Sequence, residues 1–141
     1  MATRNGSAVW EGTLREGKGT VTLGSGAFEG QYSFASRFEE GTGTNPEELI
    51  GAAHAGCFSM ALSAQLNNAG LKPERIATEA TVTLEKLESG FAITTIHLQV
   101  SARVPGATQE QFNTAASNAK AGCPVSKLFN AKITMDAKLE G

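Results

Sequence analysis

The apolar segment at residues 45–66, NPEELIGAAHAGCFSMALSAQL, is the feature that most limits what this chain can fold into. Asn45 is a favourable N-cap, Pro46 suits the first helical position, and Glu48 stands three residues after the cap. Gly70 is suited to end the helix. Apolar residues fall on nearly every face of this helix rather than along one stripe, which predicts a buried helix.

Polar residues within this segment argue against a membrane span. They are His54, Ser59, Ser63 and Gln65. A spanning helix needs about 20 largely apolar residues, so we expect a core helix and no contact with a membrane. The first residues, MATRNGSAVW, contain no apolar run typical of an export signal, and we therefore expect a cytoplasmic protein.

The segment before the helix, residues 8–38, has a strand-like pattern. Gly-rich turns divide it at residues 16–17, 24–26 and 29–30. This pattern predicts a meander of strands. The alternating residues YSFASRF, at 32–38, predict a strand that carries Arg37 near its end. A polar, Gly-rich loop at 39–44 leads from there into the central helix.

Four further elements are predicted after the central helix. They are strands at 77–87 and 91–104, a helix at 108–122 and a last strand at 131–139. The turn at 88–90 joins the first two strands as a hairpin. Thr108 and Gln111 have the spacing of a helix cap, Cys123-Pro124 ends that helix, and a short helical turn through Leu128 follows. This order of elements predicts an α+β fold with mostly antiparallel sheet.

Length and charge limit the class of function. A chain of 141 residues predicts a single domain that spans 1–141. The net charge of −2 and the small number of aromatic residues provide neither a basic surface nor a stacking surface, so we expect no nucleic-acid partner.

A helix that is apolar on all faces needs packing partners on all sides. Three groups of strands in so short a chain offer limited cover. Either the burial is less complete than the pattern indicates, or a second subunit supplies part of it. The second alternative predicts a homodimer in which the central helices pack together.

Two cysteines, Cys57 and Cys123, are the candidate reactive groups. Thiols stay reduced in the cytoplasm, so such a pair is typically catalytic, redox-active, metal-bound or simply buried. Cys57 follows the cap residue by about 18 Å along the helix axis, too far for the helix N-terminus to activate it. Reactivity of this thiol therefore requires a cation from elsewhere in the fold.

Each candidate residue also has an alternative interpretation. Arg37 is the candidate cation, but a solvent-exposed strand-end charge would look the same. Cys123 stands at a helix end, which suits a resolving cysteine, or both cysteines are structural. His54, Cys57, His97 and Cys123 could together bind zinc. However, His97 alternates out of phase with the apolar residues of its strand, so we expect no metal and no cofactor.

Two motifs resemble those of the OsmC/Ohr family of thiol peroxidases, named after the osmotically inducible protein C. They are GTNPEELIGAAHAGCFSMAL at 43–62 and AKAGCPVS at 119–126. The resemblance extends from AVWEG at 8–12 to the final strand. The sequences of these motifs are more similar to the OsmC branch than to the organic hydroperoxide resistance (Ohr) branch. It implies an intertwined homodimer in which antiparallel sheets wrap around two long central helices.

The resemblance also implies a chemistry. Cys57 would be the peroxidatic thiolate, and its sulfenic acid would condense with Cys123 to an intrachain disulfide that a dithiol reductant, lipoyl-type or other, reduces. Arg37 would stabilise the thiolate, and Glu47 would orient Arg37. Glu47 and Cys57 are about 15 Å apart along one helix, so our hypothesis is a composite site in which Arg37 and Glu47 act on Cys57 of the other subunit.

The substrate class follows from apolar surroundings near Phe58 and Met60. Burial of a hydrocarbon tail adds roughly 0.8 kcal/mol of binding free energy per CH₂, which predicts that organic hydroperoxides react better than hydrogen peroxide. We expect this activity to serve in oxidative or osmotic stress defence. Two alternatives stay open: activity of the Ohr branch, and a protein that binds hydrophobic ligands and in which the thiols are incidental.

Overall fold

The computed structural model describes all residues, 1–141, and the chain forms two compact units, residues 1–49 and 50–141. Helix α2, Pro46–Asn68, begins in the N-terminal unit and continues through the C-terminal unit. The expectation of one domain over 1–141 stays a prediction.

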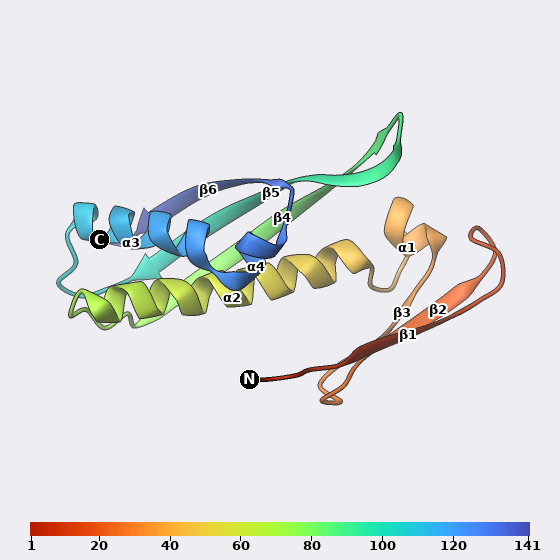
Figure 1. The fold of residues 1–141 in the computed structure, drawn as a ribbon, viewed down its shortest axis with the longest axis horizontal. Coiled ribbons are helices and arrows are strands. Elements are labelled where there is room, and N and C mark those ends of the chain that lie inside the picture. The colour runs from red at the N-terminus through yellow and green to blue at the C-terminus, as the bar shows by residue number, and fades with distance from the viewer. The chain divides into compact units, whose positions relative to one another are not determined.

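The N-terminal unit contains a three-stranded antiparallel meander (Figure 1). Its strands are β1, Gly6–Glu11, β2, Lys18–Leu23, and β3, Glu29–Tyr32. The meander and its turns at 16–17 and 24–26 were predicted. The third predicted turn is wrong, because residues 29–30 lie within β3 and pair with β2.

The strand predicted at 32–38 is also wrong beyond Tyr32, because helix α1, Phe34–Phe38, occupies this segment. Ser33 caps it: its hydroxyl accepts from the backbone N–H of Ser36, and the Ser36 hydroxyl accepts from the backbone N–H of Ser33. Two serines three residues apart can form such a reciprocal cap, and here this local bonding outweighs the alternating apolar pattern. Arg37 therefore lies on a helix rather than at a strand end.

The C-terminal unit contains a sheet of order β4-β5-β6 (Figure 1). Its strands are β4, Arg75–Leu87, β5, Gly90–Arg103, and β6, Lys132–Leu139. The predicted hairpin is confirmed, with Leu87 paired to Gly90. β6 lies parallel to β5, and helices α3, Gln109–Gly122, and α4, Pro124–Leu128, form the crossover between them. The sheets are thus mostly antiparallel, as predicted, with one parallel pair.

The core of the C-terminal unit lies between one face of this sheet and the helices. β5 contributes alternate residues, from Ile96 to Ala102, that are almost completely buried. Phe112 on α3 belongs to the same cluster. Gly51 allows α2 to approach β4, because an added Cβ would lie only 3.1 Å from the Ala80 carbonyl oxygen.

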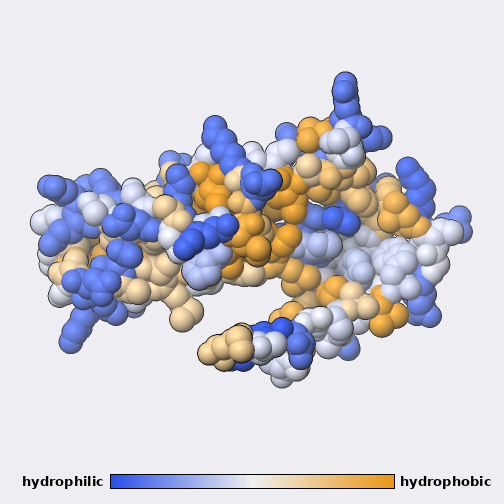
Figure 2. Space-filling model, viewed as in Figure 1, coloured by the Kyte–Doolittle hydropathy of each residue, from blue (hydrophilic) through white to orange (hydrophobic).

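Only one stripe of α2 is buried. It contains His54, Phe58, Leu62 and Leu66 at helical spacing, and continues towards the helix start through Gly51 and Glu47. Other positions stay exposed, and Met60 is 77% exposed. Hydrophobic surface is visible in this part of the C-terminal unit, near α2 and α4 (Figure 2). The expected all-round burial is therefore not reached within one chain.

By length and composition alone, α2 meets the requirement of a membrane span, with a mean hydropathy of 1.3. Its buried stripe, however, packs into the core beside β5 and α3. This stripe therefore contributes to the core of the C-terminal unit.

Candidate active site

Two thiols meet in the C-terminal unit. Cys57 is half-buried on α2, whereas Cys123 is buried between α3 and α4, and both are free. The two thiols are close enough for Cys123 to raise the pKa of Cys57. Sequence spacing could not show that these two sulfurs, 66 residues apart, would lie together.

The surroundings of Cys57 within this unit do not activate it. Burial is the main influence and raises the pKa of the Cys57 thiol. The backbone N–H of Val125 donates to the sulfur and lowers this pKa, but the neighbouring Cys123 raises it again. No cation of this unit is among these influences. A reactive Cys57 thiolate therefore needs a positive charge from outside the C-terminal unit.

Cys123 is held by Ser126. Cys123 is the N-cap residue of α4, and its sulfur accepts from the backbone N–H of Ser126 at 3.3 Å. The Cys123 thiol also donates to Ser126 Oγ at 3.2 Å, and Ser126 Oγ is 2.7 Å from Nε2 of His54. Sequence reasoning missed Ser126, although a serine three residues after a helix cap could have indicated it. It considered His54 only as a satisfied helix residue or a metal ligand.

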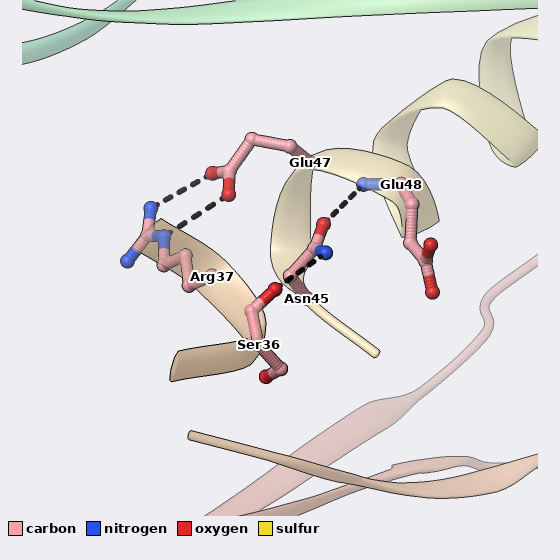
Figure 3. A network of polar contacts seen from close by, with 5 residues as sticks. All are labelled: Ser36, Arg37, Asn45, Glu47 and Glu48. Atoms are coloured by element: carbon pink, nitrogen blue, oxygen red, sulfur yellow. Dashed lines mark hydrogen bonds and ion pairs between the residues drawn. The ribbon is translucent and has the colours of Figure 1, made fainter. Parts of the chain in front are cut away.

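The N-terminal unit contains an arginine–carboxylate pair (Figure 3). Arg37 Nε donates to Glu47 Oε1 at 3.1 Å, and Arg37 Nη2 donates to Glu47 Oε2 at 2.8 Å. The Glu47 side chain is 10% exposed and that of Arg37 is 35% exposed. This two-bond geometry fixes the guanidinium plane and leaves Nη1 for another acceptor. The predicted pairing of Arg37 with Glu47 is thus present, and its role stays a proposal.

Caps at the start of α2 hold this pair in place (Figure 3). Asn45 caps the helix by accepting from the backbone N–H of Glu48 at 2.8 Å, and its side-chain amide donates to the Ser36 carbonyl oxygen at 3.0 Å. The Glu48 carboxylate accepts from Thr44 Oγ1 rather than from the cap residue's N–H. Glu48 therefore has a structural part at the helix start, and Glu47 is the acid that binds arginine.

An apolar cavity lies beside Arg37 in the N-terminal unit. Its volume is about 210 Å³, and Trp10, Tyr32, Phe34 and Phe38 are among its lining residues. Gly19 permits the close approach of Trp10 and Tyr32, because an added Cβ there would collide with both rings. The ring centres of these two residues are 5.3 Å apart. The cavity thus combines an aromatic lining with the positively charged side chain of Arg37.

The structure bears on two other expectations and changes one of them. Phe58 cannot line a substrate cavity as we expected, because it is completely buried in the core. His97 lies on the opposite side of β5 from its buried neighbours, as predicted, and contacts Thr134 and Asp136 of β6. His54 and His97 therefore form hydrogen bonds with different residues. No three His, Cys, Asp or Glu side chains lie close enough together to bind a metal ion.

A family model described as OsmC-like protein matches residues 39–138, well over half of the chain. The chain belongs to this family. Peroxiredoxin OsmC of Escherichia coli (strain K12) is 52% identical over 138 residues, which cover 97% of this chain and 96% of that protein. The organic hydroperoxide resistance protein of Xanthomonas axonopodis pv. citri is 31% identical over 100 residues, 70% of this chain and 68% of that protein.

Solved structures share the OsmC-like fold. An OsmC-like protein from Mycoplasma pneumoniae has a TM-score of 0.77 at 14% identity, and covers 99% of each chain. The organic hydroperoxide resistance protein OhrB of Bacillus subtilis has a TM-score of 0.68 at 24% identity, with 96% of this chain and 98% of that chain covered. At these identities the likeness concerns the fold alone.

The match to the OsmC-like family includes three of the four candidate residues, Glu47, Cys57 and Cys123. It begins two residues after Arg37. The assignment of Arg37 therefore depends on its geometry, the bidentate pair with Glu47, rather than on the family match.

Proposed function

We propose that this chain is a cysteine-based peroxidase that reduces organic hydroperoxides, and hydrogen peroxide more weakly, to alcohols or water. The observation that carries the proposal is the neighbouring pair of free thiols, Cys57 and Cys123, on a chain of the OsmC-like family. The name of the Escherichia coli relative, Peroxiredoxin OsmC, supports the OsmC branch over the Ohr branch, since the Ohr relative is less similar.

In the first step the Cys57 thiolate attacks the terminal oxygen of the hydroperoxide. The O–O bond breaks, Cys57 becomes a sulfenic acid, and the alkoxide takes up a proton to leave as the alcohol. In the second step the Cys123 sulfur attacks the Cys57 sulfur, the S–O bond breaks, and water leaves. A dithiol reductant, lipoyl-type or other, then reduces the resulting disulfide by thiol–disulfide exchange and is itself oxidised.

The first step needs a cation beside Cys57, and Arg37 is our candidate. Glu47 holds its guanidinium by two hydrogen bonds and leaves Nη1 for a thiolate. We assign Arg37 and Glu47 to Cys57 of a partner subunit, in an intertwined homodimer with composite sites. The exposed apolar positions of α2, such as Met60, support such an interface.

The cavity beside Arg37 suggests where the organic part of the substrate binds. Its aromatic residues would bury a hydrocarbon tail, while Arg37 lines the same cavity. Each buried CH₂ adds roughly 0.8 kcal/mol, so alkyl and aryl hydroperoxides should react faster than hydrogen peroxide. A cytoplasmic site of action suits an enzyme whose resting thiols must be kept reduced.

The test is a free-thiol titration with mass analysis of the intact chain, before and after one equivalent of cumene hydroperoxide. The wild type should lose both thiols and two hydrogen atoms as the disulfide forms. Cys123→Ser should lose the Cys57 thiol only and gain one oxygen, which a sulfenic-acid reagent traps. Unchanged thiols in both proteins would contradict the proposal and favour the protein that binds hydrophobic ligands.

A further inference from the structure

A buried hydrogen-bond chain joins three residues from different parts of the C-terminal unit. It runs from Cys123 through Ser126 on α4 to His54 on α2. Cys123, Ser126 and His54 are 1%, 6% and 0% exposed. The two-step cycle described above uses only the first of them.

The donors and acceptors of this chain have a definite order. Because Ser126 Oγ accepts the hydrogen of the Cys123 thiol, its own hydrogen is directed to Nε2 of His54. A neutral imidazole that accepts at Nε2 carries its hydrogen at Nδ1. Burial lowers the pKa of His54, which keeps the ring neutral near pH 7 and able to accept.

His54 Nδ1 is buried and has no hydrogen-bond partner within the chain. Such an atom costs stability, and an apolar residue at this position would avoid that cost. A purely structural part for His54 does not account for this arrangement. Only Nε2 is engaged, and it is engaged with the hydroxyl that contacts the Cys123 sulfur.

We propose that Ser126 is a catalytic residue of the resolving step and that His54 is its positioning residue. The inference rests on the proposed two-cysteine cycle and deepens it. The Ser126 hydroxyl takes the proton of the Cys123 thiol while its own proton passes to His54 Nε2. The backbone N–H of Ser126, already on the sulfur, then stabilises the Cys123 thiolate.

The resolving step is balanced without a further reactant. The Cys123 thiolate attacks the Cys57 sulfenic acid, the new S–S bond replaces the S–O bond, and hydroxide leaves. His54 returns its proton, which combines with that hydroxide to form the water that is lost. Cys123 is oxidised and the sulfenic sulfur of Cys57 is reduced to the disulfide level, so the hydroperoxide has supplied the only oxidant.

The test separates the two chemical steps in a single turnover of the full chain. Ser126→Ala and His54→Gln are mixed with one equivalent of cumene hydroperoxide, quenched with a thiol-alkylating reagent at increasing times, and analysed by mass. We expect sulfenic acid on Cys57 to form at the wild-type rate in both variants. The disulfide should form about tenfold more slowly or worse, as expected when a proton acceptor is removed.

Two comparisons show whether the effect belongs to the hydroxyl. Ser126→Thr keeps a hydroxyl and should restore much of the rate of disulfide formation. Thr134→Val is the matched control, because Thr134 Oγ1 contacts the other histidine, His97, at 2.6 Å, and neither belongs to the thiol pair. Its two rates should equal those of the wild type. With excess hydroperoxide, Ser126→Ala should also accumulate sulfinic acid on Cys57, since the slow disulfide no longer protects it.

Disulfide formation at the wild-type rate in both Ser126→Ala and His54→Gln would overturn the inference, and so would an equal slowing of both steps. Absence of any disulfide in the wild type is a different result. It would overturn the two-cysteine cycle itself, and this inference with it.

Discussion

Arg37 determines, in this account, whether Cys57 is ionised at neutral pH. Only the thiolate attacks a hydroperoxide, so the rate falls as the pH drops below the Cys57 pKa. Burial and Cys123 raise that pKa, and Arg37 must oppose both influences. Arg37→Ala should therefore move the midpoint of the pH–rate profile to higher pH and slow sulfenic acid formation at pH 7 by about tenfold for each unit of pKa regained.

Arg15 provides the matched control for this prediction. It also contacts the aromatic cluster, with its guanidinium 4.6 Å from the centre of the Phe34 ring, but it has no carboxylate partner. Arg15→Ala should leave the pH–rate profile in place. Arg37→Lys should be intermediate, because lysine keeps the charge but not the two-bond fork. An unchanged profile in Arg37→Ala would remove Arg37 from the site.

His54 gives the fold a dependence on pH that can be measured without any substrate. Its pKa is lowered in the folded chain, so the unfolded chain binds more protons below the ordinary value of 6.5. The free energy of unfolding should therefore fall as the pH drops through that value, until the folded form protonates as well. Urea unfolding at several pH values should show this slope, and His54→Gln should show less of it. An identical slope in both proteins would contradict the burial of a neutral imidazole.

At the level of elements, α1 is the support that presents Arg37. Ser36 is its most constrained residue: it is 6% exposed, and its hydroxyl donates to the Thr44 carbonyl oxygen at 2.7 Å while accepting from the N–H of Ser33. Ser36→Ala leaves both backbone groups without this partner and should lower the free energy of unfolding by roughly 1–2 kcal/mol. Urea unfolding measures this loss.

The control for Ser36 is Ser25→Ala, which removes an exposed serine hydroxyl that accepts only from the N–H of Ala27. It should change stability by no more than about 0.5 kcal/mol. Hydrogen exchange in α1 should also become faster in Ser36→Ala. If Ser36→Ala were as stable as the wild type, the caps would not be what holds α1.

The sequence was sufficient for the elements whose signals are local. Thr108 and Gln111 form the predicted cap of α3, and the turn after Leu87 closes the predicted hairpin. It failed at α1, where the alternating apolar pattern competed with the cap formed by Ser33 and Ser36. Periodicity and capping are separate signals, and in a five-residue segment the cap decides.

Contacts between distant segments were beyond sequence reasoning. The pairing of Cys57 with Cys123 and the hydrogen bond of His54 with Ser126 depend on how the crossover of α3 and α4 returns to α2. No spacing rule carries that information. The pair of Arg37 and Glu47, with its two hydrogen bonds, was expected from family resemblance and guanidinium geometry, and the structure contains it.

At the scale of the whole molecule, the exposed side of α2 should be a subunit interface. Met60→Glu places a charge at a position that is 77% exposed in the single chain and that we expect to be covered in a dimer. The wild type should sediment at twice the chain mass of 14.7 kDa, and Met60→Glu should shift toward the monomer and lose peroxidase activity. Leu23→Glu, which alters an exposed leucine at the end of β2, is the control and should stay dimeric.

Co-expression of Arg37→Ala chains, which are slow at pH 7, with Cys57→Ser chains, which are inactive, tests the composite site most directly. In a mixed dimer, the Cys57 of one chain meets the intact Arg37 of the other, so one functional site is rebuilt. Purified through two different affinity tags, the mixed dimer should reduce cumene hydroperoxide at about half of the wild-type rate per dimer, since one of two sites is complete. A mixed dimer no faster than the Arg37→Ala parent would contradict the account, because it would mean that Arg37 acts only on the Cys57 of its own chain.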